Sequence, residues 1–259
     1  MAIVQTEALV LRSYRLGETS LIVSLFTRDY GLMRCVAKGA RGGKSRFGAS
    51  LEPGVRVSAV VYRKLTRDLQ LISKTDIVRA WPALWDDPDR FARAGAVLEF
   101  LDRAAYGESG DPELLDLACE TLDAMSSAPL PVLEILLRGF EIQACDRLGL
   151  APEVRQCLEC RRPLEEGGLF HSMRGGLLCG DPCGGDGSAF RISERARRTL
   201  VYLLERPASA LAVLDAARYP GPEVARAVER FLTAHLERFE GLRASRVGEA
   251  LVRYARGGA

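Results

Sequence analysis

Four cysteines in the second half of the chain have the spacing of metal ligands. Cys157 and Cys160 are separated by two residues, and Cys179 and Cys183, after eighteen more, are separated by three. Two close thiolate pairs joined by a short hairpin bring four soft ligands within reach of one ion, as in structural Zn²⁺ sites. We therefore predict one structural zinc ion in a closed site. Buried or redox-active thiols, or His171 in place of one cysteine, are the alternatives.

The other three cysteines, and the termini, indicate the compartment. Cys35, Cys119 and Cys145 lie on an expected strand or on apolar helix faces, so we expect them to be packing residues. Seven cysteines in a chain without a secretory leader are typical of a reducing compartment. The longest uncharged run has ten residues, residues 124–133, whereas a membrane span needs about twenty apolar ones. We therefore expect a soluble, cytoplasmic protein that does not enter membranes.

A basic loop near the N-terminus is the second candidate for chemistry. Arg34, Lys38, Arg41, Lys44 and Arg46 fall within thirteen residues that include no acidic residue. Intervening glycines keep this loop thin, so its cations can reach a phosphate backbone. Further cations on neighbouring elements would extend the loop into a groove: Arg12, Arg15, Arg63, Lys64 and Arg67.

Aromatic residues near these cations could stack on unpaired bases. Tyr14, Tyr62 and Phe47 are the candidates, and core packing is the alternative for Tyr62 and Phe47. Of the 36 basic residues 32 are arginine, which binds phosphate bidentately and stacks on bases.

The distribution of charge supports a polyanionic ligand. The 259 residues carry a net charge of +2, but residues 1–80 have fourteen Lys or Arg against six Asp or Glu. Residues 81–150 have five against fourteen, and residues 151–259 have seventeen against fourteen. A basic module beside an acidic one is expected if only the first meets a polyanion. A solvated surface of uneven charge is the alternative.

The sequence offers little for catalysis. Residues 39–45 resemble a nucleotide-binding phosphate loop, but they place three residues between the glycines where that loop needs four. The histidines, His171 and His235, do not suggest a Ser-His-Asp or Cys-His arrangement. The acidic cluster at residues 86–89 is better explained as a helix start. We therefore expect a binding protein and no enzyme.

The secondary-structure elements that must position these residues divide the chain into a β region followed by a helical region. Five β-rich segments punctuated by Gly and Pro favour a five-stranded barrel of the oligonucleotide-binding (OB) type over residues 1–80. The strands are expected at residues 8–12, 21–26, 32–37, 55–62 and 69–78.

The pattern becomes helical after Pro82. Asp87-Pro88 and Asp111-Pro112 are start signals, and Phe91, Ala94 and Leu98 continue an apolar stripe behind the first. Further helices are expected at residues 130–148, 193–204 and 223–239. The predicted fold class is therefore α+β and multi-domain. A helical bundle over residues 81–259 follows the barrel, and a zinc-ribbon-like insert interrupts it at about residues 151–190.

Several blocks of sequence resemble the RecO family of bacterial recombination mediators. Residues 7–12 (EALVLR), 16–20 (LGETS) and 36–41 (VAKGAR) are similar to the N-terminal domain of that family. The similarity continues through residues 140–160 and through GGLLC at 175–179. Taken together, the similarity covers residues 1–80 and 130–185, and over residues 81–130 and 190–259 it is limited to helical character. The second cysteine pair is one residue wider than is usual in the family, some members of which lack all four cysteines.

The resemblance implies a non-enzymatic function near the bacterial nucleoid. It implies binding of single- and double-stranded DNA, annealing of complementary strands and partnership with RecR. It also implies contact with the acidic C-terminal tail of single-stranded-DNA-binding protein, and thereby indirect help in loading RecA on coated gaps. That tail needs a cationic, apolar pocket, for which Arg138 and the helix of Arg195 and Arg198 are candidates. Two rival functions stay open: an RNA- or translation-associated OB-fold zinc protein, and a nuclease.

Overall fold

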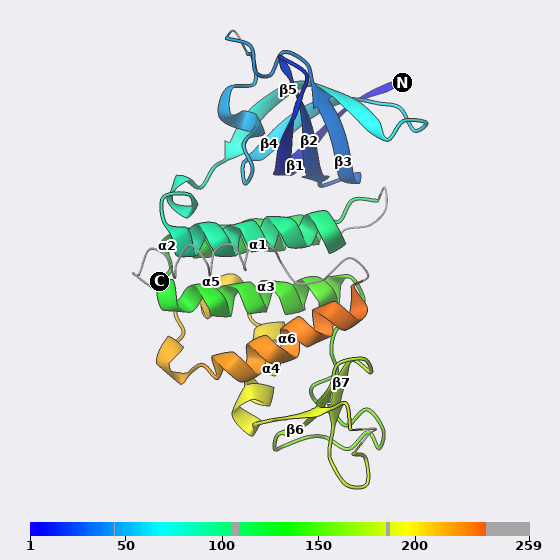
Figure 1. The fold of residues 1–259 in the computed structure, drawn as a ribbon, viewed down its shortest axis with the longest axis vertical. Helices are drawn as coiled ribbons and strands as arrows, with labels where there is room; N and C mark the ends of the chain where they lie inside the picture. Colours follow the sequence, from blue (N-terminus) through cyan, green and yellow to red (C-terminus); the bar gives the residue numbers. More distant parts are fainter. Residues whose placement is uncertain (44, 105–108, 185–186, 237–259) are drawn as a thin grey trace. The chain divides into compact units, whose positions relative to one another are not determined.

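The structure, a computed structural model, describes residues 1–236 except 44, 105–108 and 185–186 (Figure 1). Contacts within the chain group residues 1–126 into one compact unit and residues 127–236 into a second. The two helices that follow the barrel thus group with it, while the predicted domain boundary at residue 80 stays a prediction. None of the described helices is long and apolar enough to cross a membrane.

Five strands form a closed barrel in the first unit, which confirms the predicted architecture. Around the barrel the order is β1-β2-β3-β5-β4, and all neighbours are antiparallel except β3 and β5. The strands are β1 (Ala2–Leu16), β2 (Ser20–Thr27), β3 (Gly31–Ala37), β4 (Arg56–Arg63) and β5 (Leu69–Arg79). Alternate side chains, such as Val23, Cys35 and Ile72, are fully buried inside it.

Strand β1 is much longer than its predicted core of residues 8–12. Its first half pairs with β4 and its second half with β2, and the register shifts between Val10 and Arg12. Such a bulge bends a strand, which lets one strand serve both neighbours and close the barrel. Polar residues on the outer face, including Gln5 and Glu7, keep the first half of β1 from reading as a continuous apolar run.

Helices α1 (Pro88–Ala104) and α2 (Pro112–Ser127) follow the barrel and begin where the sequence predicts. The Oδ1 atom of Asp87 accepts from the backbone N–H of Arg90 at 3.0 Å, and Asp111 caps Leu114 in the same way at 2.9 Å. One expectation is wrong: Phe91 does not face inward but is 43% exposed. It lies in the first turn of α1 and packs edge-on against Trp85 instead.

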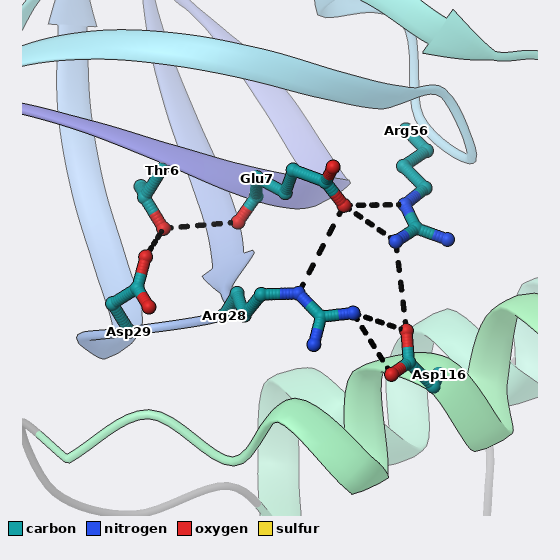
Figure 2. Close-up of polar contacts among 6 residues, drawn as sticks. All are labelled: Thr6, Glu7, Arg28, Asp29, Arg56 and Asp116. Carbon is teal, nitrogen blue, oxygen red and sulfur yellow. Dashed lines mark hydrogen bonds and ion pairs between the residues drawn. The ribbon is translucent and has the colours of Figure 1, made fainter.

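Charged residues join one end of the barrel to α2. Figure 2 shows Arg28 of the β2–β3 turn and Arg56 of β4, each of which contacts both Glu7 of β1 and Asp116 of α2. Arg28 donates to both carboxylate oxygens of Asp116, at 2.6 and 2.8 Å. The positive charges at this end of the barrel are therefore largely neutralised.

The second unit is built around helix α3 (Leu133–Arg147), which contacts three further helices. These are α4 (Glu194–Glu205), α5 (Ala208–Leu211) and α6 (Gly221–His235). Ser193 caps α4 as predicted, with its Oγ accepting from the backbone N–H of Ala196 at 3.2 Å. The predicted end of α6, residues 237–239, lies outside the described residues.

The insert between α3 and α4 forms a small antiparallel sheet, as a ribbon-like insert requires. Its strands, in the spatial order β7-β6-β8, are β6 (Gly168–His171), β7 (Gly176–Leu178) and β8 (Phe190–Ile192). Gly176 lies so close to the backbone of Glu153 that an added Cβ would come within 2.4 Å of the Glu153 carbonyl oxygen. A glycine is therefore required where the two segments meet.

Candidate nucleic-acid interface and metal site

The sulfur atoms of Cys157, Cys160, Cys179 and Cys183 gather within 4.8 Å of one another. Cys160 Sγ lies 3.8 Å from Cys179 Sγ. Tetrahedral coordination with Zn–S bonds of about 2.3 Å places sulfur atoms about 3.8 Å apart, so the donor set fits such an ion. One cysteine pair precedes β6 and the other follows β7, so the sheet holds the pairs together.

The pKa values of two thiols in the cluster agree with a site that binds a cation. Burial opposes ionisation of Cys157, but backbone N–H groups that hydrogen-bond its sulfur outweigh this and lower the pKa of Cys157 to about 6. Desolvation and the neighbouring thiols raise the pKa of Cys183 to about 12. Four thiols this close cannot all ionise without a positive charge among them.

The histidines of the second unit have other partners. His171 is buried; its Nδ1 accepts from the backbone N–H of Arg174 at 3.4 Å, and its Nε2 lies 3.0 Å from Ser188 Oγ. Both ring nitrogens of His171 therefore have partners within the insert. His235 Nε2 bonds the carbonyl oxygen of Ser172 at 2.8 Å.

The remaining cysteines are buried as expected. Burial raises the pKa of Cys35 and of Cys145 to about 12, and of Cys119 to about 11. Thiols held in the protonated state are inert packing groups.

Ion pairs sort the cations of the barrel into two sets. Those against α1 and α2, or late in β5, have carboxylate partners, as in Arg12 with Asp102 at 3.0 Å and Arg79 with Asp123 at 2.7 Å. A second set has no carboxylate partner among the described residues, and we call these the unpaired cations: Arg15, Arg34, Lys38, Arg41, Arg46, Lys64 and Arg67.

The unpaired cations share one end of the barrel, apart from Arg34 within β3. They lie at or after the ends of β1, β3 and β4, which the strand register places opposite the end that meets α2. In OB folds the β2–β3 face and the loops after β1 and β4 form the oligonucleotide site. Of the predicted binding residues, Arg12 is paired, Arg63 lies over the ring of Tyr30, and Lys44 lies outside the described residues.

Arg41 anchors the basic loop to the β1–β2 turn. The backbone N–H of Arg41 donates to the carbonyl oxygen of Thr19 at 2.8 Å, and its guanidinium donates to the carbonyls of Gly17 and Glu18. Phe47 is only 4% exposed and belongs to the barrel core, so core packing is its role and the stacking alternative is wrong. Arg41 thus holds its part of the loop over the β1–β2 turn.

An apolar row crosses the outer face of the barrel, and sequence reasoning found only its two tyrosines. Direct cross-strand pairing joins Tyr14 to Ile22, Ile22 to Val36, Val36 to Leu71 and Leu71 to Tyr62. These five residues, the apolar row, are half-buried or exposed, while their sequence neighbours Val23, Cys35, Ile72 and Val61 are fully buried. Because paired residues point to one face, the row forms a continuous apolar strip among the unpaired cations.

Two larger cavities differ in charge. The Arg195 cavity, of about 630 Å³, lies in the second unit; its lining includes Ile135, Tyr202 and Tyr219, with three arginines against two acids. The Trp85 cavity, of about 770 Å³, lies in the first unit between the barrel and α1; its lining has two acids against Arg12. Only the first combines apolar walls with an excess of positive charge.

The other proposed partner of an acidic peptide, Arg138, is buried and therefore inaccessible. Its side chain is 7% exposed and contacts Glu134, Glu141 and Glu229 at 2.7, 2.9 and 2.6 Å. Its charge is already balanced within the helices, so the expectation that it could bind a tail is wrong.

Comparisons with known proteins agree with this architecture. The family model described as "Recombination protein O N terminal" matches residues 1–81, and "Recombination protein O C terminal" matches residues 86–244. The chain is 33% identical to the DNA repair protein RecO of Anaeromyxobacter dehalogenans strain 2CP-C over 236 residues, 91% of this chain and 92% of that one. It is 30% identical to that of Exiguobacterium sibiricum over 239 residues, 92% of each chain.

Proposed function

This chain belongs to the RecO family of DNA repair proteins, and from that premise we propose that it is a non-enzymatic mediator that binds DNA strands through its barrel and anneals them. The observation that carries the proposal is the apolar row among cations that lack carboxylate partners. Stacking on the two tyrosines of the row tolerates every base, and unpaired cations release counterions from phosphates. Such a surface holds a strand without reading its sequence.

Annealing sets conditions that this surface meets. Two phosphate backbones repel, so cations must neutralise them, while the bases must stay free enough to pair. Half-buried aliphatic residues such as Ile22 and Val36 offer contact area without hydrogen bonds to base edges. The strands would be held by charge and released by pairing. Loading of RecA on coated gaps, with RecR as partner, would follow from this activity, as the family resemblance implies.

We further propose that the Arg195 cavity receives the acidic tail of single-stranded-DNA-binding protein. Arg198 and Arg218 pair with Glu194 and Asp215 at 3.1 and 3.5 Å, but Arg195 has no carboxylate partner among the described residues and would favour a carboxylate of the tail. The apolar walls of the cavity suit an apolar end. The Trp85 cavity is as apolar, but Glu52 and Glu99 line it and would repel the tail. With a labelled tail peptide, Arg195→Gln should weaken binding and Trp85→Ala should not. If only Trp85→Ala weakened binding, the tail would belong to the Trp85 cavity instead.

The four cysteines would hold one structural Zn²⁺, whose part is to fix the ribbon. No step of strand binding needs the ion as a reactant. Its contribution is to the fold of the residues between α3 and α4.

The experiment is a salt titration of fluorescent single-stranded DNA binding with matched variants. Arg34→Gln with Lys38→Gln removes one Arg and one Lys from the unpaired cations. Lys74→Gln with Arg79→Gln removes the same charges from the same barrel, but from exposed pairs with Asp76 and Asp123. The first variant should lower the slope of log K against log salt by about 1.4, at about 0.7 per phosphate contact, and the second should leave it unchanged.

Three outcomes would contradict the proposal. Equal slopes for the two variants would mean that the unpaired cations do not contact the strand. Tighter binding of RNA than of DNA, without annealing, would favour the RNA-associated alternative. Cleavage of labelled DNA that depends on Mg²⁺ or Mn²⁺ would establish a nuclease.

A further inference from the structure

Two arginines of α6 converge on one aromatic ring of the ribbon. The Cζ atoms of Arg226 and Arg230 lie 4.1 and 5.1 Å from the centroid of the Phe190 ring. Both arginines are exposed, whereas Phe190 is 8% exposed. They are four residues apart on a helix, where two like charges are neighbours and repel.

The acidic residues of α6 do not relieve this repulsion, because each is engaged elsewhere. Glu223 Oε2 accepts from the backbone N–H of Ser193 at 2.6 Å, and Glu229 Oε1 pairs with Arg138 at 2.6 Å. Among the described residues neither Arg226 nor Arg230 has a carboxylate partner. The helix therefore presents two adjacent positive charges, both of which lie against the face of Phe190.

This arrangement suits an anion with several oxygens. The ring face attracts the guanidinium and restricts its rotation, while the N–H groups along the guanidinium edge stay free to donate. Paired donors of this kind bind phosphate bidentately and with defined geometry. A lysine pair would carry the same charge without the planar stacking.

We propose that Arg226 and Arg230 form a second phosphate-binding site, which holds the backbone of a second nucleic-acid strand. The inference rests on the proposed function in one respect, that this protein brings strands together. Neither arginine lines the Arg195 cavity or the Trp85 cavity, so an acidic peptide would find no large apolar pocket there. A backbone of repeated phosphates needs only the exposed edges of the two guanidinium groups.

The test measures the binding of two DNA strands separately, on the full-length chain. Protein is tethered at low density, saturated with one labelled oligothymidylate, and then titrated with a second that carries another label, so that base pairing cannot contribute. Arg226→Gln with Arg230→Gln should leave the first affinity within about twofold and lower the salt slope for the second strand by about 1.4. Arg226→Lys with Arg230→Lys should retain the slope and lose part of the affinity.

The matched control is Arg155→Gln with Arg174→Gln, which removes two exposed arginines of the same unit that are paired with Glu205 and Glu159. It should change the binding of neither strand. An unchanged second-strand slope in the Arg226 and Arg230 variant would overturn the inference while leaving the proposed function intact. So would a loss of tail-peptide binding in that variant with second-strand binding retained. Failure of the wild-type protein to bind even the first strand would instead overturn the proposed function.

Discussion

The buried arginine of α3 offers a quantitative test of how the second unit is held together. Arg138 lies among three carboxylates, of which Glu141 is the most buried, with 1% of its side chain exposed. Burial, opposed by Arg138, raises the pKa of Glu141 to about 7. We predict that Arg138→Leu makes stability fall more steeply with pH, because Glu141 then loses the one charge that favours its ionised form.

The sign and size follow from proton linkage. A carboxyl whose folded pKa is raised contributes stability that is present below its unfolded pKa, 4.5, and is lost as the pH rises through the folded value. Between pH 5 and 8 the wild type should lose about 2 to 3 kcal/mol from this group. In Arg138→Leu the folded pKa moves higher still, and the loss should approach about 4 kcal/mol.

The assay is urea unfolding at pH 5 and pH 8, followed by circular dichroism. Both tryptophans of the chain, Trp81 and Trp85, lie in the first unit, so tryptophan fluorescence would report the wrong part of the molecule. Adding Glu141→Gln to Arg138→Leu should remove the extra pH dependence. The exposed pair of Arg198 and Glu194 provides the control, since Arg198→Leu should cost less than about 1 kcal/mol at either pH. Equal destabilisation by Arg138→Leu at both pH values would refute the reasoning.

Three further predictions concern the barrel and the ribbon. Tyr14→Ala should weaken single-stranded DNA binding by about 1–3 kcal/mol with no change in salt slope, which an unchanged affinity in fluorescence titration would contradict. Phe47→Ala should destabilise the first unit by about 3–5 kcal/mol, because Phe47 fills the barrel core. Urea unfolding followed by tryptophan fluorescence measures this, and a cost below about 1 kcal/mol would place Phe47 at the surface. Cys157→Ala should reduce bound zinc, measured by atomic absorption, from one ion per chain and lower the melting temperature, whereas unchanged zinc and melting would exclude this ligand.

Local signals were the most predictable part of this fold. Asp87, Asp111 and Ser193 cap helices that start where the sequence indicates, because a cap depends on neighbours within four residues. The cysteine spacing likewise predicts a cluster, since a ribbon hairpin is a short-range structure. Phe91 illustrates the limit: its position fits the helical period, but Trp85 outside the helix determines which side of α1 is covered.

The candidate DNA surface was only half predictable for the same reason. A sequence gives the number of cations, but their pairing depends on α1 and α2, which bring Asp102 and Asp116 to Arg12 and Arg28. The apolar row depends on register between strands far apart in sequence, as in Val36 with Leu71. The alternation of apolar and polar residues within each strand indicates which side chains face outward. Only the closed barrel shows that the outward residues of the five strands lie side by side.

The proposed second site connects the metal to strand binding, and this yields a last prediction. Phe190 of β8 pairs with Phe170 of β6, and their ring centroids lie 5.6 Å apart. Strand β6 also pairs with β7, which leads directly into Cys179. Loss of the ion should therefore disturb Phe190, and with it the stacking that orders Arg226 and Arg230, while the barrel has no part in this chain of contacts.

Chelation should consequently separate the two strand-binding activities. After removal of zinc, the first oligothymidylate should bind the tethered protein as before, and the second should lose the portion of its affinity and salt slope that Arg226→Gln with Arg230→Gln removes. In that double variant, chelation should have no further effect on the second strand, because the stacked pair is already gone. A loss of first-strand binding on chelation, or an additional loss in the variant, would show that the metal acts on DNA binding by another route.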